Sequence, residues 1–203
     1  MRKNALRQAL QEGKTVFGTM LQESRSPAVP ELMAAAGFDF IFIDMEHGAL
    51  NMETVADLIK VTRLTGMTPL VRVSDDEYHL VARVLDAGAQ GVMVPRVERR
   101  DRVGKIVQWA KFPLDGCRGC SILKGHSDYH PQPLQEFTRH LNRENMVILQ
   151  IERRAAIEDI DDLLSVPGVD AAILGPNDLA LSLGISNDMA HPLMIESIDK
   201  VVK

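Results

Sequence analysis

The sequence predicts an α/β protein built on a parallel sheet, in the form of a (β/α)₈ barrel. Short apolar runs alternate with helical patterns along the chain, turn residues stand at nearly every junction, and acidic residues follow several of the apolar runs. Strands that alternate with helices form parallel sheets, whose carboxyl ends lie at one edge. A barrel needs eight strands and about 250 residues. The 203 residues supply six βα units, so we expect a barrel truncated after about six units.

The first half of the chain contains an opening helix, Lys3–Gln11, and four predicted strands, each followed by a helix. The strands are apolar runs rich in β-branched and aromatic residues, and most of the helices end at a glycine. The predicted strands are Val16–Leu21, Phe38–Asp44, Thr68–Val73 and Gly91–Pro95. The helices that follow them are Pro27–Ala36, Met52–Leu64, Glu77–Ala87 and Arg99–Ala110.

The second half adds two strands and a long intervening segment, Phe112–Asn145. This segment carries three prolines and a predicted helix near Leu134–Leu141, and we expect it to form a lid or substrate wall over the barrel mouth. The remaining predicted elements are the strand Met146–Glu152, the helix Ala155–Leu164, the strand Val169–Gly175 and a helix from His191 to Lys203. No G-x-G-x-x-G follows the first strand, so a dinucleotide-binding fold has no support.

Composition and charge narrow the class of protein. The chain suits one domain, residues 1–203, with 45% hydrophobic and 25% charged residues. A net charge of −5 gives no reason to expect binding to nucleic acid or to an anionic membrane. No apolar run approaches the ~20 residues of a membrane span, and no signal core follows the basic N-terminus. Two cysteines form no disulfide framework, so we expect a cytoplasmic protein.

Acidic and basic side chains follow several predicted strands. Glu152 and Asp178 lie 26 positions apart at the tails of two apolar runs, and His47 follows a third run. Two carboxylates at neighbouring strand ends can converge on one divalent cation. Other roles stay open, since Asp178 could cap a helix, His47 could be structural, and Arg72 could be an ion-pair partner.

A second cluster of metal-binding residue types lies in the long segment. Cys117, Cys120, His126 and His130 have the spacing C-x₂-C-x₅-H-x₃-H, which is shorter than that of common zinc fingers. We therefore expect two free thiols here in preference to a zinc site.

Several motifs, taken in this order and spacing, resemble the HpcH/HpaI family of class II pyruvate aldolases, whose members cleave 4-hydroxy-2-oxoheptanedioate or 2-dehydro-3-deoxy-glucarate. The similarity runs from about Phe17 to the C-terminus. The motifs that carry it are Gly37–Asp39, Ile43–His47, Val71–Arg72, Leu85–Gly91, Gly116–Gly119, Gln150–Glu152 and Gly175–Leu179. The chain departs from the usual family pattern at Met20, Arg96 and Arg153.

The resemblance implies a (β/α)₈ barrel, typically assembled into homo-hexamers, and a divalent cation such as Mg²⁺, Mn²⁺ or Co²⁺. It implies that Glu152 and Asp178 bind the metal, that His47 is the catalytic base, and that Arg72 stabilises the transition state. Either Asp44 or Asp86 would hold the tautomer of His47 and raise its basicity. The residues implied to bind substrate are Gln150, Asn177, Asp178 and Arg72.

These residues imply a metal-dependent aldolase that cleaves 4-hydroxy-2-keto acids to pyruvate and an aldehyde through a metal-stabilised pyruvate enolate. No lysine at a strand end offers a Schiff base, which argues against the class I mechanism. Two alternatives remain open. The first is a related enzyme that decarboxylates or condenses a 2-keto acid, and the second is a catalytically inert, truncated barrel.

Overall fold

The computed structural model describes residues 1–185 and 188–202. Its strands are β1 (Gly18–Leu21), β2 (Phe40–Asp44), β3 (Thr68–Arg72), β4 (Gly91–Val94), β5 (Met146–Ile151) and β6 (Ala171–Leu174). Its first helices are α1 (Ala5–Gln11), α2 (Ala28–Ala35), α3 (Met52–Thr65), α4 (Tyr78–Ala87) and α5 (Arg100–Ala110). The remaining helices are the short 3₁₀ helix η1 (Gly125–Ser127), α6 (Leu134–Glu144), α7 (Arg154–Glu158), α8 (Ile160–Leu164), α9 (Pro176–Leu183) and α10 (Pro192–Val202).

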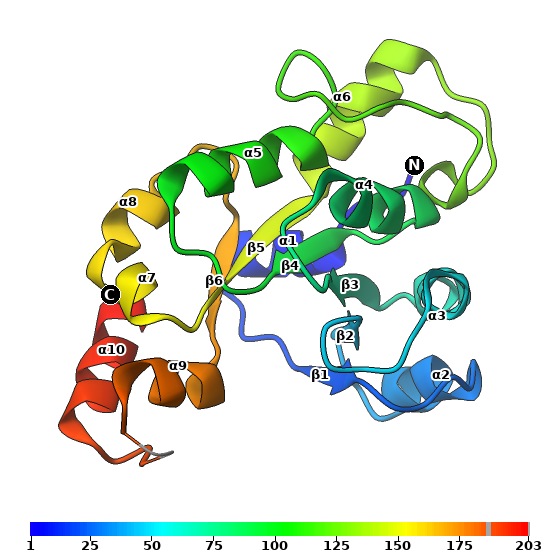
Figure 1. The fold of residues 1–203 in the computed structure, drawn as a ribbon. Helices are drawn as coiled ribbons and strands as arrows, with labels where there is room; N and C mark the ends of the chain where they lie inside the picture. Colours follow the sequence, from blue (N-terminus) through cyan, green and yellow to red (C-terminus); the bar gives the residue numbers. More distant parts are fainter. Residues whose placement is uncertain (186–187, 203) are drawn as a thin grey trace.

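The sheet is parallel throughout, and its strands follow chain order from β1 to β6. The sheet curls, and helices α2 to α5 and α7 to α10 lie around its convex outside (Figure 1). In the described residues β1 and β6 are the two edges and do not pair, so the six strands form an open half-barrel. The predicted α/β fold with its six parallel strands is confirmed.

The two faces of the sheet bury different clusters because side chains alternate between the faces of a strand. The outward rows, such as Ile41 and Ile43 of β2, pack beneath the surrounding helices in the main core. The inward rows form a second cluster that includes Phe42 and Met93, and Leu6 of α1 packs against it. Asn4 Nδ2, just before α1, donates to the carbonyl oxygen of Gln90 at 2.9 Å. Helix α1 therefore covers the amino-terminal opening of the half-barrel.

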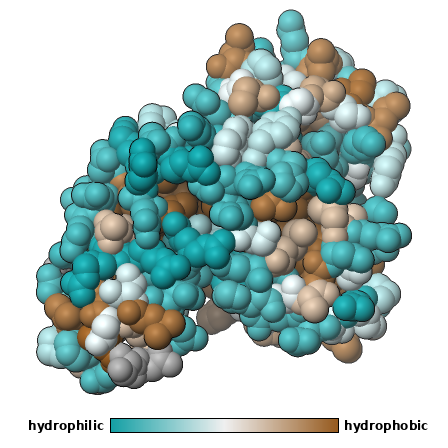
Figure 2. Space-filling view, in the orientation of Figure 1, coloured by the Kyte–Doolittle hydropathy of each residue, from teal (hydrophilic) through white to brown (hydrophobic). Residues whose placement is uncertain are grey.

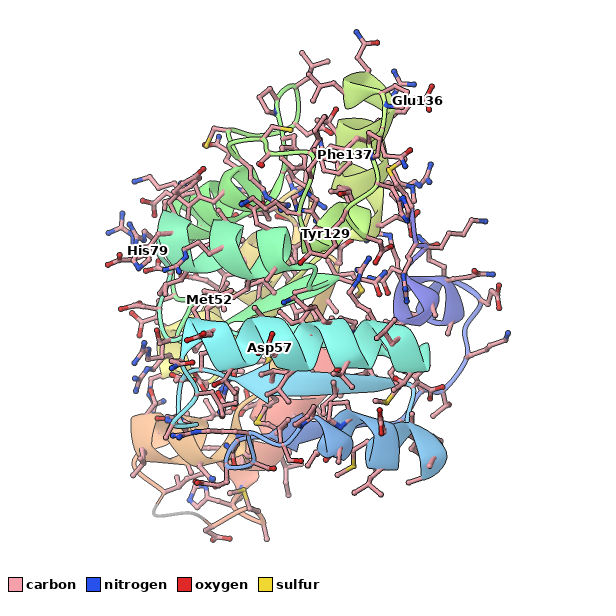
Figure 3. All side chains as sticks on the ribbon, turned by 90° about the vertical axis from the view of Figure 1, so that its right-hand side faces the viewer. Met52, Asp57, His79, Tyr129, Glu136 and Phe137 are labelled. Atoms are coloured by element: carbon pink, nitrogen blue, oxygen red, sulfur yellow. The ribbon has the colours of Figure 1, made fainter. Side chains whose placement is uncertain are left out.

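The long segment Phe112–Asn145 does not cover the carboxyl edge, so the prediction of a lid over the barrel mouth is wrong. The segment joins the end of α5 to the start of β5, and both of these points lie at the amino edge of the sheet. Gly125 of η1 packs so closely on the last turn of α4 that a Cβ there would lie 2.1 Å from the carbonyl oxygen of Ala87. His79 marks the start of α4, and Tyr129 lies beyond its other end (Figure 3).

Ion pairs and apolar contacts fix this segment to the amino edge. Asp128 Oδ1 accepts from Arg63 Nη2 at 3.0 Å, at the end of α3. Phe137 of α6 is fully buried and points inward, whereas Glu136 points into solvent (Figure 3). The segment is therefore a structural addition at the opposite end from the polar strand ends.

The predicted helix Ala155–Leu164 is two helices, α7 and α8, which meet at Asp159. The backbone of Asp159 has φ −107° and ψ 22°, outside the helical range, and its carbonyl accepts the N–H of Leu163 at 3.0 Å. The break is therefore a change of backbone conformation at Asp159, whose side chain makes no capping hydrogen bond. The last predicted helix is α10, and its predicted end at Lys203 lies outside the described residues.

The outer surface is largely polar in the view of Figure 2, with hydrophobic areas at its upper and lower edges. Exposed apolar side chains of the long segment and α6 include Leu114, Leu123 and Leu134. None of the helices within the described ranges combines the length and the apolar character that a bilayer span requires.

Candidate active site

The inner face of the half-barrel changes from apolar to polar at the carboxyl ends of β2, β3 and β5. Asp44, Arg72, Gln150 and Glu152 each continue an inward row, and they are between 0% and 6% exposed. Asp44 stands directly opposite Arg72 in the register of β2 and β3. Burial of such groups requires partners, which the four residues supply to one another.

Asp44 and Arg72 form a bidentate ion pair. Arg72 Nε and Nη2 donate to Asp44 Oδ1 and Oδ2 at 2.8 and 2.5 Å. Burial alone would raise the pKa of Asp44, but hydrogen bonds from Arg72, Gln22 and the N–H of Glu46 lower it to about 2. Between Asp44 and His47 the contact is a hydrogen bond from the backbone N–H of His47 to Asp44 Oδ1, at 3.4 Å. The carboxylate of Asp44 is thus a charged partner of Arg72 and is not hydrogen-bonded to the His47 ring.

Acid titration should expose the contribution of this pair to stability. The pKa of Asp44 falls from 3.8 to about 2 on folding, so the carboxylate adds about 2 kcal/mol to the unfolding free energy above pH ~4. That contribution is lost as the pH falls from about 4 to 2. We expect Asp44→Asn to be less stable at pH 7 and to lose less stability over this pH range in urea unfolding. Asp57→Asn, at an exposed carboxylate, is the control. An unchanged pH slope in Asp44→Asn would contradict the assignment.

Glu152 lies in the first position after β5 and is 1% exposed. The backbone N–H of Arg96 donates to its Oε1 at 2.8 Å, and Gln150 Nε2 donates to its Oε2. Arg96 has a φ of 55°, which residues other than glycine seldom adopt. Each carboxylate oxygen has two acceptor positions, so Glu152 can still bind a further electropositive group.

Gly175 leaves the space beside Glu152 open. A Cβ at this position would lie 2.4 Å from Glu152 Oε2 and 2.9 Å from Gln150 Nε2. The same Cβ would lie 2.9 Å from Glu152 Cβ, so Gly175→Ala should displace the whole Glu152 side chain and cost some stability as well. If Glu152 holds a cation, the variant should lose Mn²⁺ affinity 10- to 100-fold, measured by titration calorimetry at a temperature where it is folded. Gly104→Ala, where nothing lies within 4 Å of the added Cβ, is the control. Unchanged affinity would place the cation elsewhere.

Helix α9 begins where β6 ends, beside Glu152. Pro176 occupies the first turn, where its missing N–H costs nothing. Asn177 is exposed and Asp178 is half-buried in the same turn. The Gly175 N–H donates to the carbonyl of Ile151 at 2.9 Å, which fixes the start of α9 to the end of β5.

The donor set fits a hard divalent cation. Glu152 follows β5 and Asp178 follows the neighbouring strand β6, and carboxylate oxygens are the kind of ligand that Mg²⁺, Mn²⁺ and Co²⁺ sites use. Gly175 keeps the space beside Glu152 free of side-chain atoms. Within residues 1–185 and 188–202, no group of three or more His, Cys, Asp and Glu side chains could hold a metal. Any cation here would therefore take most of its ligands from water and substrate.

The inner face has a hollow of about 320 Å³ that opens beside these residues. Arg72 and Gln150 supply its polar lining, and Arg72 Nη1 donates to Gln150 Oε1 at 3.2 Å. Apolar and small side chains complete the walls, among them Met20, Phe40, Phe42, Met93 and Ile173. The hollow therefore offers a small molecule the polar side chains of Arg72 and Gln150 beside an apolar wall.

His47 and Glu46 follow β2 at the same edge. The His47 side chain is 56% exposed, whereas that of Glu46 is 7% exposed. Glu46 Oε2 lies 3.2 Å from Arg72 Nη1 and 3.9 Å from His47 Nε2. Burial raises the pKa of Glu46, with Arg72 opposing and the charge of Glu152 adding to the shift.

Asp86 lies near the end of α4, at the amino edge, and the structure does not bring it to His47. Its Oδ1 accepts from Arg118 Nη2 at 2.6 Å and lies 3.6 Å from His126 Nδ1. Helix α4 begins at the carboxyl edge of the sheet and ends at the amino edge. Its last turn therefore lies at the opposite edge from the end of β2. Within one chain no contact supports the role predicted for Asp86, and that role stays a prediction.

The cysteine and histidine cluster does not form a metal site in the described part of the chain. Cys117 and Cys120 are exposed and free. His126 is buried, and its Nε2 is hydrogen-bonded to the carbonyl of Ser121 at 2.7 Å.

A family model for HpcH/HpaI aldolase/citrate lyase matches residues 19–203. The chain belongs to this family. An HpcH/HpaI aldolase from Desulfitobacterium hafniense has the same fold with a TM-score of 0.93 and 37% identity, over 97% of this chain and 75% of that one. The 4-hydroxy-2-oxo-heptane-1,7-dioate aldolase of Salmonella arizonae is 32% identical, over 98% of this chain and 75% of its own. The citrate synthase SbnG is also similar, with a TM-score of 0.87 and 32% identity over 97% of this chain and 76% of its own.

These relatives establish a family of carbon–carbon bond enzymes. Aldolases and a citrate synthase share the fold at similar identity, so membership of the HpcH/HpaI family alone leaves the reaction partner open. The chain spans about three quarters of the length of these relatives.

Sequence reasoning missed two contributors to this HpcH/HpaI site. The sequence analysis assigns a role beside His47 to Asp44 and none to Glu46, although the buried carboxylate of Glu46 follows the same strand. The backbone N–H of Arg96 that holds Glu152 has no side-chain signature at all. Strand alternation would have placed Glu46 on the inner face, two residues after Asp44.

Proposed function

We propose that this protein is a divalent-cation-dependent aldolase that cleaves a 4-hydroxy-2-keto acid to pyruvate and an aldehyde, and also catalyses the reverse addition. The observation that carries the proposal is the buried Glu152 beside the start of α9, linked to Arg72 through hydrogen bonds of Gln150. The relatives named above support the aldol part of the reaction.

Glu152 and Asp178 would hold the cation, whether Mg²⁺, Mn²⁺ or Co²⁺. When bound, a cation supplies positive charge to the keto group of the substrate. The free N–H groups in the first turn of α9, near Asn177, suit the substrate carboxylate. Gln150 borders the hollow and can donate to or accept from substrate oxygens.

Cleavage of the C3–C4 bond requires a base for the C4 hydroxyl and a positive charge for the oxygen on C2. His47 would take the hydroxyl proton, and the electron pair of the broken bond moves through C3 and C2 to the keto oxygen. Arg72 would stabilise the negative charge that develops there, because the Asp44 pair holds its guanidinium in place. Protonation of the enolate at C3 then gives pyruvate.

A second candidate uses the same enolate with another partner. The similarity to a citrate synthase favours condensation of a 2-keto acid with a different electrophile, or decarboxylation to reach the enolate. An enzyme that releases carbon dioxide from oxaloacetate, and that does not exchange pyruvate with aldehydes, would support this second candidate.

We also propose that the six strands correspond to six of eight barrel strands and that the protein acts as a homo-oligomer, a hexamer by resemblance. Neither proposal affects the residues assigned above. Sedimentation analysis of the purified chain gives the oligomeric state directly.

The test of the proposed function is exchange of the pyruvate C3 hydrogens in D₂O, followed by NMR with Mg²⁺ or Mn²⁺ and then with EDTA. This half-reaction requires no knowledge of the aldehyde. Exchange that disappears with EDTA supports enolate chemistry at a cation site. A folded sample that binds Mn²⁺ and shows no exchange contradicts the proposal and supports the catalytically inert barrel.

A further inference from the structure

A hollow of about 300 Å³ lies at the amino edge, where the N-terminal arm, the end of α3 and the segment after η1 meet. Three cationic side chains and one carboxylate line it, together with an apolar and an aromatic side chain. The cations are Arg2, Lys60 and Arg63, the carboxylate is Asp128, and the other two are Leu64 and Tyr129. Three positive charges against one negative leave the lining with a surplus of two, at the opposite end of the half-barrel from Glu152 and Arg72.

Asp128 is a single counter-ion that two arginines share. Its Oδ1 accepts from Arg63 Nη2 at 3.0 Å, and its Oδ2 accepts from Arg2 Nε at 3.2 Å. Arg2 Nη1 also donates to the carbonyl oxygen of Arg63, which holds the two guanidinium groups beside the same carboxylate. Burial lowers the pKa of Arg63, and the charge of Arg2 lowers it further, although Asp128 opposes the shift. A second negative charge in the hollow would relieve this repulsion.

Lys60 and Tyr129 complete the wall of the hollow. Lys60 Nζ is 3.1 Å from Asp57 Oδ1, in a pair whose side chains are 47% and 68% exposed. Exposed pairs of this kind contribute little, so the ammonium is available to another anion. Tyr129 lies beyond the last turn of α4 (Figure 3), and Asp128 and Tyr129 have left-handed φ values of 50° and 61°. Two consecutive residues other than glycine are held in this region by their surroundings, and such conformations cluster at ligand sites.

We propose that this hollow binds a small organic phosphate monoester, with the phosphate against Arg2, Lys60 and Arg63 and the organic part against Leu64 and Tyr129. A phosphate monoester carries nearly two negative charges at pH 7, which matches the surplus of the lining. Guanidinium groups bind phosphate oxygens through several N–H donors. Because the cations converge on one small hollow, a single doubly charged group fits it better than two separated carboxylates. This inference does not depend on the proposed function.

The experiment is a calorimetric titration of the full chain with phenyl phosphate in a phosphate-free buffer of low ionic strength. Lys60→Gln should weaken binding about tenfold, because it removes one positive charge from the hollow. Asp57→Asn should tighten binding by about two- to fivefold, because the ammonium of Lys60 then loses its competing partner. Lys105→Gln, at an exposed lysine of α5, is the control and should bind as the wild type does. Both test positions are exposed, so neither substitution threatens the fold.

Tyr129→Asn tests the place of the organic part. Asparagine adopts the left-handed backbone more readily than tyrosine, so the variant keeps the turn and loses the aromatic wall. Its affinity for phenyl phosphate should fall about tenfold, and its affinity for inorganic phosphate by less than about threefold. Equal losses for the two probes overturn the assignment of the organic part.

Two results overturn the proposal as a whole. The first is phenyl phosphate that does not bind the wild type at concentrations up to about 10 mM. The second is phenyl phosphate that binds wild type, Lys60→Gln and Asp57→Asn with equal affinity, which would place it elsewhere on the chain, for example beside Arg72. Opposite changes in Lys60→Gln and Asp57→Asn, with Lys105→Gln unchanged, support the site at the amino edge.

Discussion

Glu152→Gln is expected to reduce cation-dependent exchange of the pyruvate C3 hydrogens by at least 1,000-fold. The substitution keeps the size of a side chain that is 1% exposed but removes the negative charge from one of two proposed cation ligands. An amide oxygen is a much weaker ligand for a divalent cation than a carboxylate, so both cation affinity and the charge at the keto oxygen are lost. The measurement is the initial exchange rate in D₂O at saturating Mn²⁺.

The fold should survive this change. The amide oxygen can still accept from the Arg96 N–H or from Gln150 Nε2, which now donate to the carboxylate. We therefore expect the unfolding free energy to change by less than about 1 kcal/mol. Glu98→Gln, an exposed glutamate near the same edge, should exchange at the wild-type rate. Undiminished exchange in Glu152→Gln would remove Glu152 from the cation site and with it the basis of the proposed function.

Strand positions and their carboxyl-edge residues could be predicted from the sequence because both follow from local patterns. The apolar run Met146–Glu152 gives strand β5 and also places Glu152 at its end. Residue pairing across strands could not be predicted, because it depends on register. Asp44 is bonded to Arg72 because these two residues stand opposite one another in β2 and β3.

Chain direction explains the positions of two features that the sequence analysis expected at the carboxyl edge. The segment Phe112–Asn145 follows a helix and precedes a strand, so it had to lie at the amino edge, although its length suggested a lid. Asp86 in the last turn of α4 lies at that same edge for the same reason. Motif order alone gave no such information, since residues close in a motif list can stand at opposite ends of a βα unit.

Arg72→Lys is expected to lower kcat/KM by 100- to 1,000-fold and to destabilise the fold. Arg72 donates through Nε and Nη2 to Asp44 and through Nη1 to Gln150, and a lysine ammonium cannot reproduce this planar arrangement. The charge that faces the hollow would move from the position where negative charge develops on the keto oxygen. The rate of aldol cleavage, followed in a coupled assay that detects pyruvate, measures the catalytic loss.

Stability separates the two roles of Arg72. Breaking a buried ion pair costs about 3–5 kcal/mol when one charge is left without its partner, so Arg72→Ala should lose this much in urea unfolding. Arg72→Lys keeps a positive charge and should lose less. Arg102→Lys provides the control, because Arg102 forms a similar two-pronged pair with Asp76 at 2.6 Å to each oxygen, outside the hollow. If Arg72→Lys and Arg102→Lys affected kcat/KM equally, the guanidinium of Arg72 would be structural only, and the charge beside the keto oxygen would have to come from another group.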